Sequence, residues 1–131
     1  MENSLNTRND AMLLEYIEHA LKNLNNALIC LQPNENDVMG DIDGAFSCIN
    51  KSIIDNDWNN YLNNSTTLTA QETIAVKKWF NQIYNVIRFI NQRATNNTKA
   101  ELQNGINPIL NDQSLLAVKK KLANAVNQKR S

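Results

Sequence analysis

One apolar stripe constrains the fold of this 131-residue chain more than any other feature of its sequence. Between residues 10 and 31 the apolar side chains recur every three or four positions, which is the spacing of one face of an α-helix. The stripe consists of Leu13, Ile17, Ala20, Leu21, Leu24, Leu28 and Leu31. A capping-box-like pair, Thr7 and Asp10, predicts the start of this helix, and Pro33 predicts its end. Such a long apolar face requires other elements to pack along it.

The rest of the chain also shows helical spacing. We expect helices over residues 37–54, 69–93, 98–105 and 114–128, with a short helical turn within 55–65 and a further helix start at 107–108. Thr69 and Glu72 form a capping box at the start of the second of these helices. With three glycines and two prolines, the chain has too few turn formers for a β fold.

The sequence therefore predicts an all-α protein, an antiparallel helical bundle of four principal helices with short extra helical turns. We expect residues 1–131 to form a single helical domain, frayed at residues 1–6 and 129–131. One segment allows two interpretations, because residues 34–44 fit either a helix or a loop. If they are helical, Gly40, Gly44 and Ser47 form a stripe of small residues that suits close helix packing, within the chain or in a dimer.

The charges are sorted by half. Through Glu72 there are eleven acidic residues against three basic ones, a net charge of −8, and from Thr73 onward ten basic residues oppose two acidic ones, a net charge of +8. The overall charge of zero hides this asymmetry, which is typical of proteins that bind a charged partner. We expect a partner-binding face in the basic half, formed by Lys77, Lys78, Asn81, Arg88, Lys119, Lys120 and Lys121.

His19 is the single histidine of the chain and is predicted to lie opposite the apolar stripe, exposed to solvent. The segment 19–22, His-Ala-Leu-Lys, resembles the phosphoacceptor segment of histidine-phosphotransfer domains, which are four-helix bundles. In that family a lysine at the position of Lys22 helps to neutralise the phosphoryl group. The chain departs from the family at Asn23, where a glycine normally lets the response regulator approach. The resemblance implies phosphotransfer through His19.

Other chemistry finds little support in the sequence. Cys30 and Cys48 are predicted to be reduced, half-buried structural thiols, because their spacing matches no metal or redox motif. Two acidic clusters, around Asp41 and Asp55, lack ligands that a calcium loop needs, so we expect no metal site and no cofactor. A signal peptide and a membrane-spanning stretch are both missing, which predicts a cytoplasmic protein without membrane contact.

These observations predict a small non-catalytic helical protein that binds another macromolecule. A protein partner with an acidic surface is the first hypothesis, in a regulator, adaptor or immunity-type role, and self-association stays open. Asparagine supplies 24 of the 131 residues, which is typical of an AT-rich bacterium or phage. Nucleic-acid binding through the basic half is the alternative, and histidine phosphotransfer through His19 is the second alternative.

Overall fold

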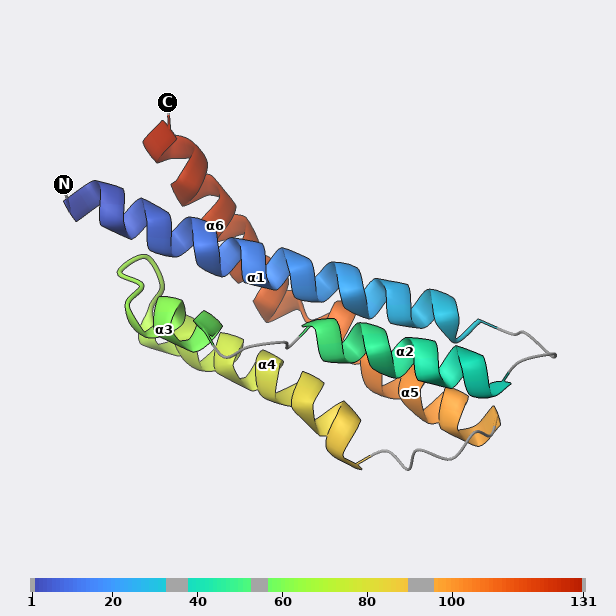
Figure 1. Cartoon of the computed structure of the whole chain (residues 1–131). Helices are drawn as coiled ribbons and strands as arrows, with labels where there is room; N and C mark the ends of the chain where they lie inside the picture. The colour runs from blue at the N-terminus through green and yellow to red at the C-terminus, as the bar shows by residue number, and fades with distance from the viewer. Residues whose placement is uncertain (1, 33–37, 53–56, 90–95, 131) are drawn as a thin grey trace.

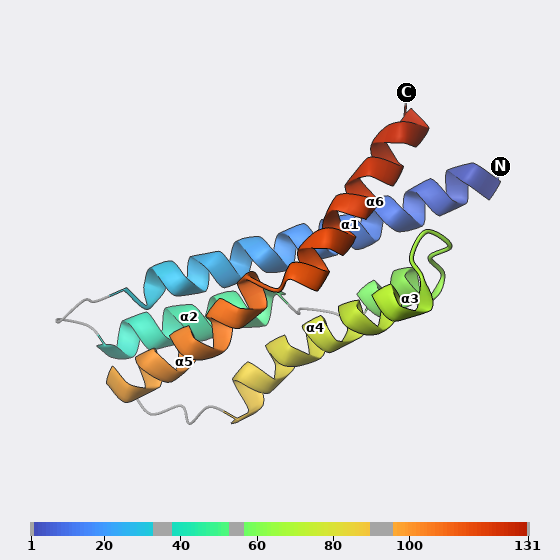
Figure 2. The same cartoon turned by 180° about the vertical axis from the view of Figure 1, so that it is seen from behind.

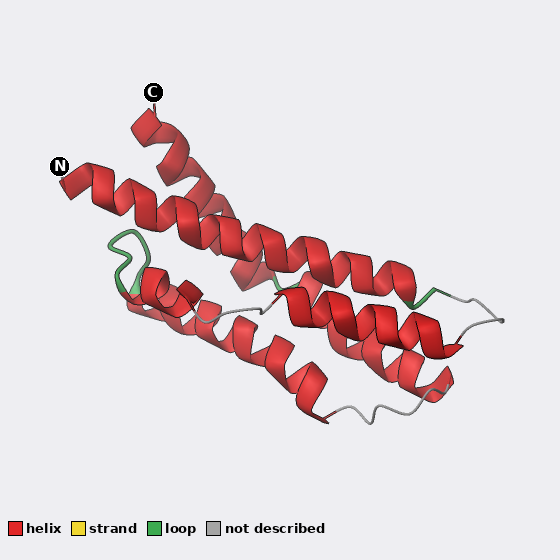
Figure 3. Ribbon diagram, viewed as in Figure 1, coloured by secondary structure: helices red, strands yellow, loops and turns green. Residues whose placement is uncertain are grey.

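The computed structural model describes residues 2–32, 38–52, 57–89 and 96–130, and all regular structure in these residues is helical. The elements are α1 (Glu2–Cys30), α2 (Val38–Ser52), α3 (Asp57–Asn63), α4 (Ala70–Phe89), α5 (Asn96–Leu110) and α6 (Gln113–Arg130). No strand occurs in these residues, as Figure 3 shows. The predicted all-α class is therefore confirmed. Residues 38–44 are helical, and residues 34–37 lie outside the described residues.

Helix α1 is the element on which the others assemble. It contacts α2, α3, α5 and α6, and α4 contacts the same four helices. In Figure 1, α2 runs back beside the second half of α1, α4 lies below them, and α5 lies behind α2. Figure 2 shows from the other side that α6 crosses α1, so that both chain ends lie at the same end of the molecule.

The apolar stripe of α1 is buried as its spacing predicts. Five members of the stripe are at most 1% exposed, and Leu21 and Leu28 are half-buried at its edge. The predicted start of this helix is wrong, because α1 begins at Glu2 and passes through Thr7 and Asp10 without a break. Helix α6 extends to Arg130. Fraying of residues 1–6 and 129–131 stays a prediction, and Met1 and Ser131 lie outside the described residues.

A second prediction, of two separate helical pieces between residues 96 and 110, is wrong. The expected break near Gly105 and Pro108 does not occur, and α5 is one helix of 15 residues, as long as α2. Leu102, Ile106 and Ile109 continue one buried stripe through both residues. Proline removes the donor to the carbonyl four positions earlier, which belongs to Asn104. Asn104 and Pro108 are exposed, so water can satisfy that carbonyl and the packing of the stripe prevails.

Local signals place the start of α4 correctly. The Glu72 amide donates to Thr69 Oγ1 at 3.1 Å, and the Thr69 amide donates to Glu72 Oε1 at 2.8 Å, which is the predicted capping box. Helix α6 begins in a related way, since Asp112 Oδ1 accepts a hydrogen bond of 3.1 Å from the Leu115 amide.

An aromatic cluster holds α3, α4 and α5 together. Trp79 is fully buried, and its indole N–H donates to the Ile109 carbonyl at 2.8 Å. The ring of Phe80 meets Trp79 edge-on at 5.1 Å and stacks on Trp58 of α3 at 4.2 Å. Aromatic pairs in such arrangements add about 0.5–1.5 kcal/mol beyond the burial of their area. The cluster therefore anchors the short α3 to the core.

Asp10 ties α1 to the loop that joins α3 and α4. Its carboxylate is 1% exposed and accepts hydrogen bonds from the hydroxyl groups of Thr67 (2.5 Å) and Ser65 (3.4 Å). The Ser65 hydroxyl in turn accepts weaker hydrogen bonds from the Thr67 and Leu68 amides. A buried carboxylate needs such donors, because an unpaired charge in the interior is strongly unfavourable.

Replacing this carboxylate tests its role. We expect Asp10→Ala to lower the free energy of unfolding by about 1.5–3 kcal/mol, because hydrogen bonds to a buried charged group are lost. Urea denaturation followed by circular dichroism measures the change. The matched control is Asp43→Ala at an exposed position of α2, where we expect a change within about 0.5 kcal/mol. Equal stability of the two variants would contradict this role.

Candidate functional site

The outward face of α4 carries the first group of predicted site residues. Lys78 and Asn81 are exposed and Lys77 is half-buried, while Trp79 and Phe80 between them point into the core. In the part of the chain that the structure describes, no ion pair involves Lys77 or Lys78. Arg88 belongs to α4 by its backbone, and its side chain lies outside the described residues. The structure thus presents two lysines and an amide together on one solvent-facing surface.

An exposed isoleucine on the same face was missed by the sequence analysis. Ile74 is 55% exposed, although it lies in a helix whose other described large apolar residues are mostly buried. It precedes Lys77 and Lys78 by three and four positions, so their side chains are neighbours on the helix surface. The signal for it was its position about half a turn away from the stripe of Val76, Trp79 and Ile83. We call Ile74, Lys77, Lys78 and Asn81 the α4 face.

The three lysines of α6 do not extend the α4 face as predicted. Lys121 points to α4, but its ammonium group forms an ion pair of 2.7 Å with the Glu72 carboxylate. Successive residues of a helix are about 100° apart, so Lys119 lies about 200° around α6 from Lys121. Lys120 is exposed and Lys119 half-buried. The structure therefore brings one of the three lysines to α4, and an acidic residue already pairs with it.

Glu72 takes part in two interactions at once. Its Oε1 accepts from the Lys121 ammonium and from the Thr69 amide. The hydrogen bond from Lys121 is the largest cause that lowers the pKa of Glu72 below its ordinary value, followed by the bond from the Thr69 backbone. The ionised carboxylate thus joins the start of α4 to α6.

A second cation of the basic half is used inside the molecule. Lys99 of α5 is buried and donates to Asp41 Oδ2 at 2.9 Å and to the Gln32 carbonyl at 3.3 Å. Gln103, one turn later, donates to the Leu31 carbonyl at 2.9 Å. Asp41 lies in the first turn of α2, where a negative charge is favourable. These contacts connect the end of α1, the start of α2 and α5.

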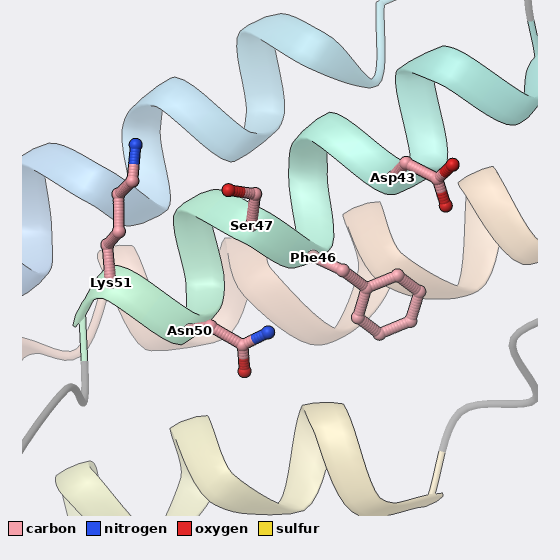
Figure 4. A pocket seen from close by; sticks show the side chains of 5 residues that line it. All are labelled: Asp43, Phe46, Ser47, Asn50 and Lys51. Atoms are coloured by element: carbon pink, nitrogen blue, oxygen red, sulfur yellow. The ribbon is translucent and has the colours of Figure 1, made fainter.

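The stripe of small residues on α2 is only partly a packing face. A Cβ atom built at Gly44 would lie 3.3 Å from the Cys30 sulfur of α1, so Gly44 is where the two helices pack closely. Gly40 and Ser47 are exposed. Figure 4 shows a shallow depression on the surface of α2, lined by Asp43, Phe46, Ser47, Asn50 and Lys51. Packing within the chain accounts for Gly44, and the dimer face stays a prediction.

His19 is exposed, as predicted. The side-chain nitrogen of Asn23 lies 3.1 Å from His19 Nε2 and donates to the His19 carbonyl at 2.9 Å. Asn23 itself is buried, at 8% exposure. Its amide occupies the position at which the phosphotransfer family has a glycine, so the structure adds no support for phosphotransfer. This function stays a prediction.

The ion pair of Glu72 and Lys121 makes stability depend on pH. Because the pKa of Glu72 is lower in the folded chain, its contribution is present above about pH 5 and is lost as the pH falls through the folded pKa. We expect Glu72→Gln to lower the free energy of unfolding by about 0.5–1 kcal/mol at pH 7, because the pair is partly exposed. Urea denaturation at decreasing pH should show the difference between the variant and the unmodified protein shrinking as Glu72 becomes protonated.

The control for this prediction is Lys121→Met. It should show the same loss at pH 7, and the double variant should lose little more than either single variant. Additive losses would show that the two side chains do not stabilise the fold through each other.

No helix of the described residues is long and apolar enough to cross a membrane. Within the same residues, no three His, Cys, Asp or Glu side chains lie together as metal ligands would. The chain matches no protein-family model, no curated protein and no solved structure.

Proposed function

We propose that this protein works without catalysis, as a helical scaffold that docks a protein partner on the α4 face. The observation that carries the proposal is an exposed isoleucine beside two lysines that pair with no acidic residue among those described. Protein interfaces typically combine an apolar anchor with charged and amide groups around it. Ile74 supplies the anchor, and Lys77, Lys78 and Asn81 supply the polar surround.

The charges of the α4 face favour a partner with an acidic surface. Complementary charges speed association and exclude partners of the wrong sign. A regulator, adaptor or immunity-type protein needs this kind of steered and specific association. The antiparallel bundle predicted from the sequence is the rigid support that we propose for the face. On the inner side of α4, the aromatic cluster of Trp58, Trp79 and Phe80 anchors this helix to α3.

Nucleic-acid binding is the weaker candidate. A phosphate backbone is bound by a continuous series of cations, and each neutralised phosphate adds to the salt dependence of the affinity. Two lysines of the basic half, Lys99 and Lys121, instead neutralise Asp41 and Glu72. An exposed isoleucine beside Lys77 and Lys78 suits a protein surface better than a phosphate backbone.

Charge reversal tests the lysines of the α4 face. We expect Lys78→Glu to weaken capture of the partner from nuclease-treated host lysate at least about tenfold, equivalent to about 1.4 kcal/mol. Quantitative mass spectrometry of the captured proteins measures the change. Lys51→Glu is the matched control, because Lys51 is an exposed lysine on α2 and its reversal changes the net charge equally. Equal losses for both variants would show that net charge alone decides binding.

A second variant tests the apolar anchor. We expect Ile74→Ala to weaken the same capture about fivefold, since truncating an anchor at an interface typically costs about 1 kcal/mol or more. Met39→Ala is the control, because Met39 is 63% exposed on α2 and its truncation removes a similar apolar area. If nuclease treatment abolishes capture and Ile74→Ala has no effect, the nucleic-acid alternative replaces this proposal.

A further inference from the structure

The two cysteines are far apart in the sequence and are neighbours in the fold. Cys30 is the last residue of α1, and Cys48 lies in the second half of α2. Both are free thiols, and both are half-buried at the edge of the hydrophobic core. The pKa of the Cys30 thiol is raised by its burial and also by Cys48, which requires the two side chains to be close to each other. The two thiols are half-buried, as predicted, and their proximity was not predicted.

Gly44 gives the two thiols the room they share. It lies one helical turn before Cys48, on the same side of α2, and a Cβ atom there would lie 3.3 Å from Cys30 Sγ and 3.8 Å from Cys30 Cβ. The missing side chain lets the end of α1 pack closely onto α2 at this point. A disulfide requires such an approach, because its Cα atoms are usually about 4.4–6.8 Å apart.

We infer that Cys30 and Cys48 are a redox-modified pair, which a small-molecule disulfide such as oxidised glutathione converts into an intramolecular disulfide. The inference is independent of the docking proposal, because neither cysteine belongs to the α4 face. Their half-buried position leaves both thiols partly open to a small oxidant.

The reaction needs two exchange steps. The thiolate of one cysteine attacks a sulfur of oxidised glutathione, which forms a mixed disulfide and releases one glutathione thiolate. The thiolate of the second cysteine then attacks the protein sulfur of the mixed disulfide, forms the Cys30–Cys48 bond and releases the second glutathione. The two cysteine sulfurs lose two electrons, which reduce the glutathione disulfide. The two protons of the cysteine thiols end on the two glutathione molecules.

The surroundings of the Cys30 thiol slow its reaction with a disulfide. Burial raises the pKa of the Cys30 thiol, and the neighbouring Cys48 and Asp41 raise it further. Since the thiolate is the attacking species, a raised pKa slows the exchange at neutral pH. Once formed, the bond would join the end of α1 to α2 beside the contacts of Lys99 with Asp41 and Gln32.

The test uses the full-length, fully reduced protein and oxidised glutathione as the oxidant, followed by alkylation of the remaining thiols and intact-mass measurement. We expect a product without glutathione and without alkylated cysteine, about 2 Da lighter than the reduced chain because two hydrogen atoms are lost on disulfide formation. Peptide mapping should find Cys30 linked to Cys48. Cys30→Ser and Cys48→Ser should each stop at the mixed disulfide with glutathione.

Three results would overturn the inference. They are stable glutathione adducts on both cysteines of the unmodified protein, a disulfide between two chains, and two thiols that stay open to alkylation.

A second measurement needs no variant and compares the unmodified protein in buffer with the same protein in denaturant. The mixed disulfide should close at least about tenfold faster in the folded chain, because the fold holds the second thiol in place. Equal rates would show that the fold does not bring the two thiols together.

Discussion

The fold depends on covering the apolar face of α1. This helix has 29 residues, about 44 Å at a rise of 1.5 Å per residue, whereas α2 and α5 have 15 each. Since neither is long enough to cover the whole face, α2 and α5 pack along its second half, and α6 and α3 complete the rest. Helix α4 then closes the core from the opposite side with Trp79 and Phe80, which reach α5 and α3.

Buried polar contacts determine how the helix ends meet. The Asp10 carboxylate accepts hydrogen bonds from hydroxyl groups of the loop before α4. The Lys99 ammonium group joins the end of α1 to the start of α2. Apolar packing alone allows helices to slide along each other, because it has no direction. A buried charge permits only the arrangement in which its partner is present, since an unpaired charge is too unfavourable. These contacts therefore select one alignment of the helices.

The same contacts change the meaning of the charge asymmetry. Acidic residues of the first half pair with basic residues of the second, as Asp41 does with Lys99 and Glu72 with Lys121. Part of the segregated charge thus stabilises the fold. No ion pair among the described residues involves Lys77 or Lys78 on the outward side of α4, and these two lysines lie beside an exposed isoleucine. This distinction between internal and outward cations is the reason for placing the proposed docking surface on α4. The paired thiols lie elsewhere, between α1 and α2.

The sequence by itself determined the helical class, the buried stripes and the capping box at Thr69, because all of these depend on residues within one or two helical turns. It could not determine that α5 continues through Pro108, since burial of Ile106 and Ile109 decides that outcome. Nor could it pair Asp10 with Thr67, Lys99 with Asp41, or Cys30 with Cys48, because these residues belong to different elements of the fold. Ile74 shows the same limit, since only the packed structure shows that no other described helix covers it. Periodicity indicates which face of each helix is buried, and the docking of the helices decides which residues meet there.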